Sequence, residues 1–147
     1  MLIRIAHADD LAAILGIDEL ASSDEQHRQT YLRRRVERGE CLVSVEEAGL
    51  AGYVVARPRH FFGRGFVDLL LVAPRYRRRG VARSLMAAAI GHLAGTSDFD
   101  RVFTSTNRSN QPMQQLLAAD GWQFSGELEG LDPGDPELVY FLDQAPA

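Results

Sequence analysis

An arginine-rich turn is the segment of this chain whose residue types point most directly to chemistry. Residues 71–84 run from an apolar stretch through Pro74 and a cluster of arginines into alanine-rich sequence. The first backbone N–H groups of a helix have no partner inside the helix, and the helix dipole adds positive potential there. Gly80 and Ala82 keep the backbone accessible, while arginine side chains add charge-assisted hydrogen bonds. This pattern predicts a site for the phosphates of a ligand.

Two other interpretations of the arginine turn stay open from its composition alone. A charge run is often only a solvated turn before a helix, and clustered arginines can also bind nucleic acid. The chain has 16 arginines, no lysine and 20 acidic residues, which give a net charge of −4. Because one short turn in an acidic protein is a small footprint, a nucleic-acid partner is not expected.

A second charged segment lies near the C-terminus and is acidic. Eight of the arginines lie between residues 57 and 83, and no basic residue follows Arg108. The acids singled out in the following segment are Asp132, Asp135 and Glu137. They attract a cationic amine substrate in one interpretation. In the other they are ordinary turn formers beside Gly and Pro, and both interpretations stay open.

Single residues in the apolar parts of the chain are further candidates. Asp68 lies in an otherwise apolar strand, where a lone carboxylate is costly unless it has a partner or opens onto a cleft. It is either a proton acceptor or the partner of an arginine such as Arg101. His60 is expected to be an exposed loop residue rather than a base. Phe61 and Phe62 either wall a substrate pocket or fill the core, and the core is favoured for one of them.

Hydrophobic periodicity and turn residues predict the elements that must position these candidates. Strands are expected at residues 2–5, 41–46, 51–57, 66–72, 101–106, 122–128 and 138–142. Helices are expected after Asp9–Asp10, from a Ser23–Gln26 capping box to Arg38, at 81–93 and at 111–119. Pro58 is expected to end the third strand, residues 60–63 to form a loop, and 66–72 to be a central strand covered on both faces. This order predicts an α/β fold with a mixed sheet flanked by helices.

Length and composition bound the class of protein. The chain has 147 residues, 46% of them apolar and 24% charged, which fits one compact domain over residues 1–147. No stretch is apolar and long enough to span a bilayer, and the N-terminus lacks the pattern of a signal peptide, so no membrane partner is expected. Cys41 is the single cysteine and is expected to be a small buried residue. No metal-site spacing is present, and a reducing cytoplasm is the expected compartment.

The arginine turn resembles the acetyl-CoA signature of the GNAT N-acetyltransferases, Gln/Arg-x-x-Gly-x-Gly/Ala. Arg77, Gly80 and Ala82 occupy the three signature places. Downstream, Asn110 and Met113, followed by Gly121–Trp122, resemble the second cofactor segment of that family, Asn-x-x-Ala ending in Gly-Phe. The order of elements is similar to the GNAT fold over essentially the whole chain. This resemblance implies a mostly antiparallel mixed sheet of about seven strands with about four helices.

The resemblance also implies a cofactor and a reaction. Acetyl-CoA is the co-substrate, no metal is needed, and an amine of a small molecule or peptide attacks the thioester directly in a ternary complex. A backbone N–H near Val72 polarises the thioester carbonyl. The residues that the resemblance assigns to acetyl-CoA are Leu71, Val72, Arg77, Arg78, Arg79, Gly80, Val81, Ala82, Arg83, Ser84, Asn110 and Met113.

The catalytic residues are less completely specified by the resemblance. Asp68 matches a position where some relatives carry an acid that receives the proton of the amine. Leu117 falls where many relatives carry a Tyr that protonates the leaving thiolate, so Ser109 or a water takes that role, or the thiolate leaves unassisted. The missing Tyr keeps open a non-catalytic, regulatory domain that binds acyl-CoA. A homodimer is also open, since relatives often associate through sheet edges or terminal strands.

Overall fold

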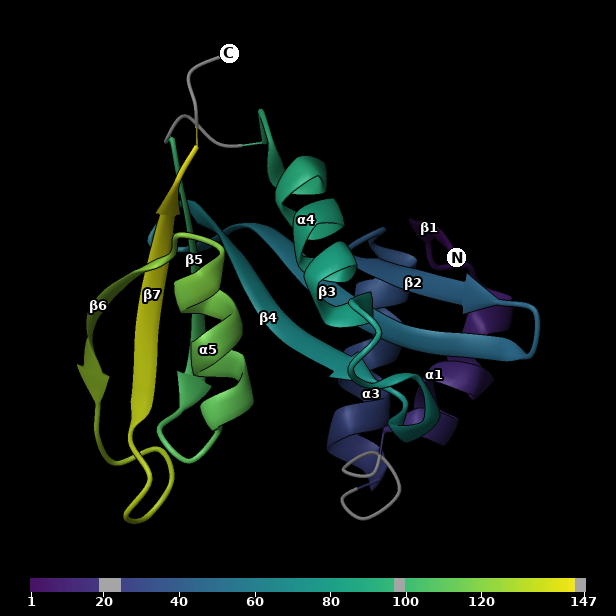
Figure 1. The fold of residues 1–147 in the computed structure, drawn as a ribbon. Helices are drawn as coiled ribbons and strands as arrows, with labels where there is room; N and C mark the ends of the chain where they lie inside the picture. Colours follow the sequence, from purple (N-terminus) through teal and green to yellow (C-terminus); the bar gives the residue numbers. More distant parts are fainter. Residues whose placement is uncertain (19–24, 97–99, 145–147) are drawn as a thin grey trace. The chain divides into compact units, whose positions relative to one another are not determined.

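The computed structural model describes residues 1–18, 25–96 and 100–144. The strands are β1 Leu2–Ile5, β2 Cys41–Glu46, β3 Gly49–Phe61, β4 Arg64–Val72, β5 Arg101–Asn107, β6 Gln123–Leu128 and β7 Glu137–Asp143. The α-helices within the described residues are α1 Leu11–Ile17, α3 Glu25–Glu37, α4 Val81–Leu93 and α5 Gln111–Ala119. Short 3-10 turns, η1 Ala8–Asp10 and η2 Pro74–Tyr76, precede α1 and α4 (Figure 1).

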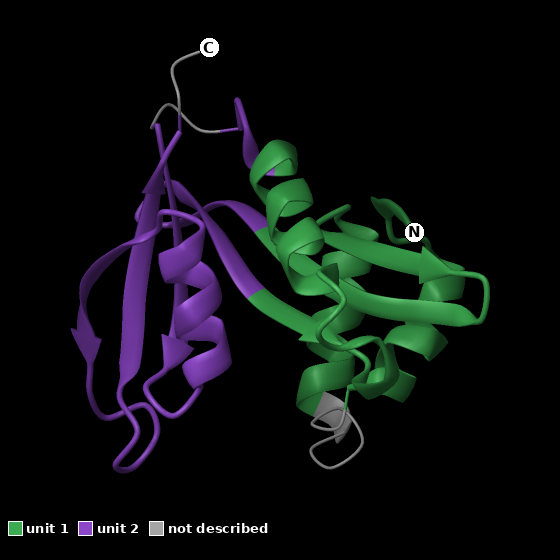
Figure 2. Ribbon diagram, viewed as in Figure 1, with its two compact units in different colours: residues 1–56, 69–92 green, residues 57–68, 93–147 purple. Residues whose placement is uncertain are grey.

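The strands are hydrogen-bonded in the order β1-β2-β3-β4-β5-β7-β6. β4 and β5 run parallel, whereas the pairs β1–β2, β2–β3, β5–β7 and β6–β7 are antiparallel. The predicted seven-stranded, mostly antiparallel mixed sheet is therefore confirmed. The chain divides into two compact units, shown in Figure 2. Unit 1 comprises Met1–Ala56 and Leu69–His92, and unit 2 comprises Arg57–Asp68 and Leu93–Ala147.

In unit 1, the side chains of β3 alternate between two layers of helices. Tyr53 and Val55 belong to a buried cluster with Ile14 of α1 and Leu32 of α3. The opposite face has no room for a side chain at Gly52, where a Cβ atom would lie 2.6 Å from the Leu71 carbonyl oxygen and 3.1 Å from Leu85 of α4. The period of two in a strand thus places α1 and α3 on one face and α4 on the other, as Figure 1 shows.

A buried polar network joins three elements of unit 1. The carboxylate of Asp18, at the end of α1, accepts hydrogen bonds from the Tyr53 hydroxyl and from Arg28 Nε of α3, the latter at 3.0 Å. Asp18 is 1% exposed and Tyr53 is 0% exposed. Burial, together with the hydrogen bond to Asp18, raises the pKa of the Tyr53 hydroxyl well above its ordinary value. A buried carboxylate is tolerated here because it has these donors.

In unit 2, the helix α5 lies against β5 and β7 (Figure 1). Thr104 faces Val67 in the parallel register of β5 and β4, and its hydroxyl donates to the Val67 carbonyl at 2.8 Å. Leu117 of α5 is fully buried, and the chain leaves this helix through Gly121, whose φ of 85° suits glycine. The predicted helices at 81–93 and 111–119 are confirmed with these bounds.

The prediction that Pro58 ends the third strand is wrong. The strand β3 continues to Phe61. A proline removes one N–H donor but leaves the chain extended, and the irregularity falls on Arg59 instead, with φ at 55°. His60 and Phe61 therefore belong to β3, and only Phe62 and Gly63, with φ at 50° and 80°, form the turn. The predicted loop at 60–63 is thus a two-residue hairpin turn.

One further expectation, for β4, is wrong, and another, for the start of α3, is not tested. The strand β4 is fully buried only at residues 65–67 and half-buried from 68 to 72, so its apolar sequence does not mean complete coverage on both faces. The capping box proposed for Ser23 and Gln26 lies outside the residues whose side chains are described. The other end of that helix agrees with expectation, because α3 stops at Glu37 and Gly39 has a φ of 69°.

Candidate functional site

The arginine turn, residues 73–80, connects β4 to α4 within unit 1. Pro74 opens the short η2 turn, and Tyr76, which is 8% exposed, anchors that turn in the unit. The guanidinium groups of Arg75 and Arg79 lie over the Tyr76 ring, 5.0 and 5.9 Å from its centroid. This buried ring holds the turn on a fixed base, so the other arginines project from a defined backbone.

The backbone of the turn presents N–H groups at the start of α4. Gly80 carries the first carbonyl of the helix, which accepts from Ser84 N at 3.1 Å. The amides of Val81 and Ala82, the first two residues of α4, have no acceptor in the described part of the chain. Arg78 and Gly80 have φ values of 62° and 79°. A Cβ atom at Gly80 would meet no protein atom within 4 Å, so glycine is needed here for the backbone conformation and leaves open space for a ligand.

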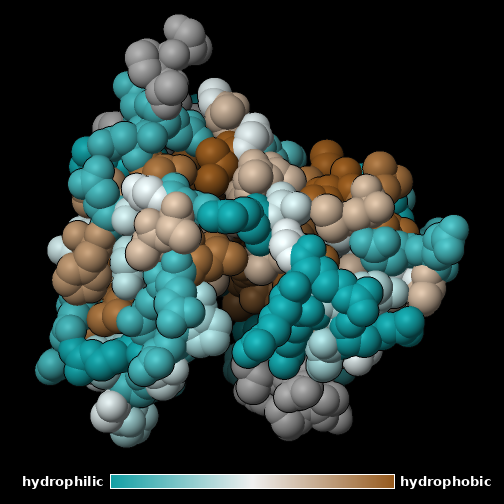
Figure 3. All heavy atoms as spheres, viewed as in Figure 1, coloured by the Kyte–Doolittle hydropathy of each residue, from teal (hydrophilic) through white to brown (hydrophobic). Residues whose placement is uncertain are grey.

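The arginine side chains of the turn are exposed and are not neutralised within the described residues. Arg77, Arg78 and Arg79 are all exposed. Arg77 Nε donates to the Val72 carbonyl at 3.2 Å, which ties the turn back to the end of β4. No carboxylate in the described ranges forms an ion pair with these three residues. Figure 3 shows the hydrophilic surface over this segment. The turn combines backbone N–H donors with positive charge and can therefore bind an anion.

The predicted cofactor residues divide between the two units. Leu71 to Ser84, with Val72 and the arginine turn, come together in unit 1. Asn110 and Met113 lie in unit 2, at the start of α5. The Asn110 side chain accepts from Met113 N at 3.3 Å, so Asn110 is the N-cap of this helix.

Ser109, the predicted alternative acid, is bound to the segment between β6 and β7. We call residues 129–136 the acidic loop. The Ser109 hydroxyl donates to Asp135 Oδ2 at 2.6 Å, and the Ser109 N–H donates to Asp135 Oδ1 at 3.0 Å. Both carboxylate oxygens of Asp135 are thus used by one residue. To act as an acid, the Ser109 hydroxyl has to leave Asp135.

Two other acids of this region, Asp132 and Glu127, also have partners. Asn107 Nδ2 donates to Asp132 Oδ2 at 2.9 Å and to the Asp135 carbonyl at 3.2 Å. Arg108 forms an ion pair with Glu127, so a basic residue does neutralise one acid of this region. Asp132 and Asp135 therefore build the loop, as the turn-former interpretation expects. The loop and Arg108 line a cavity of about 400 Å³.

Asp68 and Leu117 differ in environment. Asp68 lies on β4, half-buried, and is not free of interactions. Arg101, which we had considered as its partner, forms an ion pair with Asp143 at 2.6 Å. Leu117 has no exposed surface, so this position faces the interior of unit 2 and offers no polar group to a substrate.

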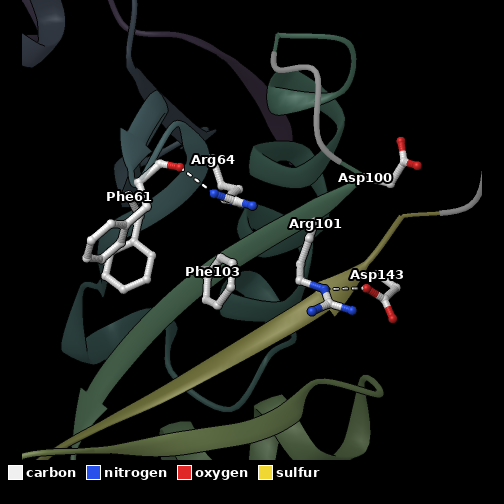
Figure 4. A pocket seen from close by; sticks show the side chains of 7 residues that line it. Phe61, Arg64, Asp100, Arg101, Phe103 and Asp143 are labelled. Atoms are coloured by element: carbon white, nitrogen blue, oxygen red, sulfur yellow. Dashed lines mark hydrogen bonds and ion pairs between the residues drawn. The ribbon is translucent and has the colours of Figure 1, made fainter.

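Unit 2 contains a further cavity that includes none of the predicted cofactor or catalytic residues. It has a volume of about 500 Å³ and is lined by Phe61, Phe62, Arg64, Asp100, Arg101, Phe103 and Asp143. Phe61 stacks on Phe66 at 5.2 Å and contacts Phe103 at 5.0 Å, whereas Phe62 is 81% exposed. Figure 4 shows the Arg101–Asp143 pair on one side of this cavity. Phe61 thus joins a half-buried aromatic cluster, and both phenylalanines border a pocket.

Cys41 adds no reactive thiol to these candidates. Cys41 is buried, as expected, and this burial raises the pKa of its thiol to about 12. Within residues 1–18, 25–96 and 100–144, no group of three His, Cys, Asp or Glu side chains could hold a metal ion. In the same ranges no helix has both the length and the apolar character needed to cross a membrane.

Comparison with known proteins identifies the class to which this fold and turn belong. The sequence profile of the acetyltransferase (GNAT) family matches residues 8–122. A GNAT acetyltransferase from Bacillus cereus ATCC 10987 has a similar structure, with a TM-score of 0.85 and 32% identity over 99% of this chain and 98% of that one. The chain therefore belongs to the acetyltransferase (GNAT) family.

Two further proteins are similar to this chain, one in sequence over part of its length and one in fold. Spermine/spermidine N(1)-acetyltransferase of Bacillus subtilis is 31% identical over 67 residues, which are 46% of this chain and 44% of that protein. The chain thus matches less than half the length of this curated relative. A putative acetyltransferase of Salmonella typhimurium, solved with its cofactor acetyl-CoA, has a TM-score of 0.78 and 19% identity over 99% of this chain and 95% of that one. At this identity the likeness concerns the fold.

Proposed function

We propose that this protein transfers the acetyl group of acetyl-CoA to a primary amine of a small molecule or peptide. The observation that carries the proposal is the arginine turn. Its helix-start amides have no acceptor in the described part of the chain, and Arg77 to Arg79 are exposed without a carboxylate partner there. These features fit a pyrophosphate, which needs backbone donors, positive charge and room at Gly80.

In this proposal the arginine turn of unit 1 binds the pyrophosphate of acetyl-CoA, and the start of α5 in unit 2 is a second candidate segment for the cofactor. The amides of Val81 and Ala82 and the guanidinium groups of Arg77 to Arg79 bind the pyrophosphate, and the end of β4 at Val72 orients the remaining arm. Acetyl-CoA supplies the acetyl group as a reactive thioester. The protein contributes the orientation of the two reactants, which is worth many orders of magnitude in rate for well-aligned groups.

Asp68 is the proton acceptor in this proposal. An amine is protonated near neutral pH, so one proton has to leave the nitrogen before it can attack a carbonyl. A half-buried carboxylate in β4 is suited to this task because it is shielded but not sealed from solvent. Asp68→Asn keeps the shape and removes the basicity. We expect turnover to fall by about 10²–10⁴-fold, with acetyl-CoA affinity nearly unchanged. Equal turnover across the pH range in a folded variant would exclude this role.

The acceptor that we propose is cationic. A carboxylate that accepts hydrogen bonds keeps its negative charge, so Asp132 and Asp135 still create negative potential at the acidic loop. Glu129 of the same loop is exposed and has no partner among the described residues. The name of the relative from Bacillus subtilis, a spermine/spermidine acetyltransferase, supports a polyamine as the first substrate to test.

The experiment that tests the proposal measures binding and thiol release separately. Calorimetry with acetyl-CoA, desulfo-CoA and a DNA duplex distinguishes a CoA site from a nucleic-acid site. Release of free thiol with a panel of amines then distinguishes an enzyme from a regulatory domain that only binds acyl-CoA. The fully buried Leu117 is the observation that favours the regulatory alternative, because it leaves no Tyr to protonate the thiolate. Binding without thiol release for every amine would favour that alternative.

The proposal also covers the organisation and location of the protein. The chain acts as one catalytic domain over residues 1–147, in the reducing cytoplasm, where a single buried cysteine stays a thiol. Association into a homodimer stays a prediction, with the edge strands β1 and β6 as candidate contacts. Size-exclusion chromatography with light scattering tests it.

A further inference from the structure

The turn between β5 and α5, residues 107–110, is shared by the acidic loop and the helix. On the loop side, Ser109 donates two hydrogen bonds to Asp135, and the Arg108 N–H donates to the Pro136 carbonyl at 2.9 Å. On the helix side, Gln114 Nε2 of α5 donates to the Arg108 carbonyl at 2.5 Å. The same four residues therefore fix the position of both segments.

Asp135 holds this turn more tightly than the other acids do. Its two oxygens accept from the N–H and the hydroxyl of one residue, so they fix the orientation of the Ser109 peptide as well as its position. Asp135 is half-buried and the adjacent Pro136 is buried, which shields these bonds from water. Asp132, in contrast, is exposed and accepts a single side-chain bond from Asn107.

The residue after Ser109 is the N-cap of α5. Asn110 accepts from Met113 N with its side chain and from Gln114 N with its carbonyl, at 3.3 Å each. Because the peptide between Ser109 and Asn110 is rigid, a displacement at Asp135 moves the cap and the first turn of the helix. This first turn is the second segment that the proposed function assigns to acetyl-CoA.

We infer that Asp135 is a positioning residue that couples the acidic loop to the acetyl-CoA segment at the start of α5. The inference rests on the proposed function, since it takes α5 as a cofactor segment and the loop as the border of the acceptor site. Coupling between two ligand sites is reciprocal, so a cationic acceptor at the loop changes acetyl-CoA affinity, and acetyl-CoA changes the affinity for the acceptor.

The test uses the full chain and compares acetyl-CoA affinity among four variants by calorimetry. Asp135→Ala removes both bonds, and we expect the Kd to rise about tenfold, the effect of losing a charge-assisted hydrogen bond. Asp135→Asn keeps one acceptor and is expected to lie between Asp135→Ala and the wild type. Ser109→Ala is expected to act like Asp135→Asn. Glu47→Gln removes an exposed charge from the turn between β2 and β3, outside both proposed ligand segments, and is the control, with acetyl-CoA affinity unchanged.

Kinetics separate positioning from catalysis and from misfolding. A positioning role raises the KM for acetyl-CoA more than it lowers kcat, and the double variant Ser109→Ala with Asp135→Ala is no worse than Asp135→Ala. If Ser109→Ala lowers kcat with acetyl-CoA affinity unchanged, Ser109 is the acid and the inference is overturned. An Asp135→Ala protein that is folded and binds acetyl-CoA like the wild type would also overturn it.

Amide hydrogen exchange gives a readout that needs no ligand. Loss of the anchor at Asp135 is expected to speed exchange at the Met113 and Gln114 amides, while α4 stays as protected as before. Unchanged exchange at α5 in Asp135→Ala contradicts the inference, whatever the protein binds. If the wild type itself fails to bind acetyl-CoA, the proposed function fails and the coupling with it, while the exchange data still show whether Asp135 holds α5.

Discussion

The arginine turn of unit 1 and the acidic loop of unit 2 are both dense in charge, yet the protein uses their charges in opposite ways. Arg77, Arg78 and Arg79 project into solvent without carboxylate partners among the described residues. In the acidic loop, Asp132 and Asp135 turn toward the N–H, hydroxyl and amide donors of residues 107–109.

The difference shows how to distinguish charged side chains that are available to a ligand from charged side chains that form hydrogen bonds within the protein. A carboxylate is an acceptor only, and loop amides offer it many donors, so an acid in a loop is readily used by the backbone beside it. An arginine can use only acceptors, and at the start of a helix the backbone offers N–H groups instead. The arginines of this turn therefore keep most of their hydrogen-bond donors unused by the described residues, which fits the proposed anion ligand.

The largest effect that we expect comes from a substitution in the arginine turn. Gly80→Glu adds strain at a φ of 79° and a negative charge where the proposed pyrophosphate binds. Acetyl-CoA affinity should fall by about 100-fold or more, since placing like charges against each other costs several kcal/mol and the new side chain also occupies the space of the ligand. Calorimetry measures this.

Two control variants separate the causes of that effect. Gly80→Ala adds the strain without the charge and should weaken binding less. Gly91→Glu adds the charge on the exposed side of α4, where a Cβ atom has open space, and should bind acetyl-CoA like the wild type. Tight binding by Gly80→Glu would mean that the ligand lies elsewhere.

A second prediction concerns Asp18, a buried carboxylate with a structural role in unit 1. Tyr53→Phe removes one of the donors to the buried Asp18 carboxylate. We expect the free energy of unfolding to fall by about 1–3 kcal/mol, the usual cost of leaving a buried acceptor short of a donor. Urea unfolding measures this change. An unaffected midpoint would show that water or another donor replaces the tyrosine hydroxyl.

A third, smaller effect tests whether the acids that build the loop also attract the substrate. Neutralising Asp132, Asp135 and Glu137 together should raise the KM for a di- or polyamine by about tenfold and weaken its salt dependence, because a screened attraction is removed. The KM is measured at saturating acetyl-CoA, because Asp135 also holds Ser109 and the start of α5, and the control is a neutral amine, for which the KM should not change. If the best acceptors prove to be neutral or carboxylate-bearing amines, the charge of this loop serves structure alone.

The smallest effect concerns Asp10, a partly exposed carboxylate before α1. It accepts from Arg4 at 2.7 and 3.0 Å and from the His7 N–H at 2.7 Å. The hydrogen bond from Arg4 lowers the pKa of Asp10 below its ordinary value. Stability from a lowered pKa is present above the unfolded value of about 3.9 and is lost as the pH falls through the folded value.

Asp10→Asn should therefore lower the free energy of unfolding at pH 7 by up to about 1 kcal/mol, the upper end for a solvent-screened ion pair such as Arg4–Asp10. The difference from the wild type should vanish as the pH falls below the folded pKa, where both side chains are neutral. Thermal unfolding at several pH values measures this. A difference that persists in acid would mean that shape, rather than charge, holds the helix start.

The amino-acid sequence by itself determined most of the secondary structure and predicted the place of the proposed anion site. The bounds of β2, α4 and α5 follow from alternation, helical periodicity and the residues that end each element. These are local properties, so they can be read along the chain. The same holds for the arginine turn, because a strand, a Pro, arginines and a Gly before a helix are consecutive residues.

Only the tertiary structure decided which charged side chains form hydrogen bonds within the protein and which stay exposed. The bonds of Ser109 with Asp135 and of Asp18 with Tyr53 join residues 26 and 35 positions apart. Composition cannot reveal such pairs, because a carboxylate has the same identity whether it faces solvent or a donor from a distant segment. The course of β3 past Pro58 was decided in the same way, since pairing with β4 outweighs a missing donor. Local preferences set the elements, and contacts between distant residues assign the charged side chains their roles.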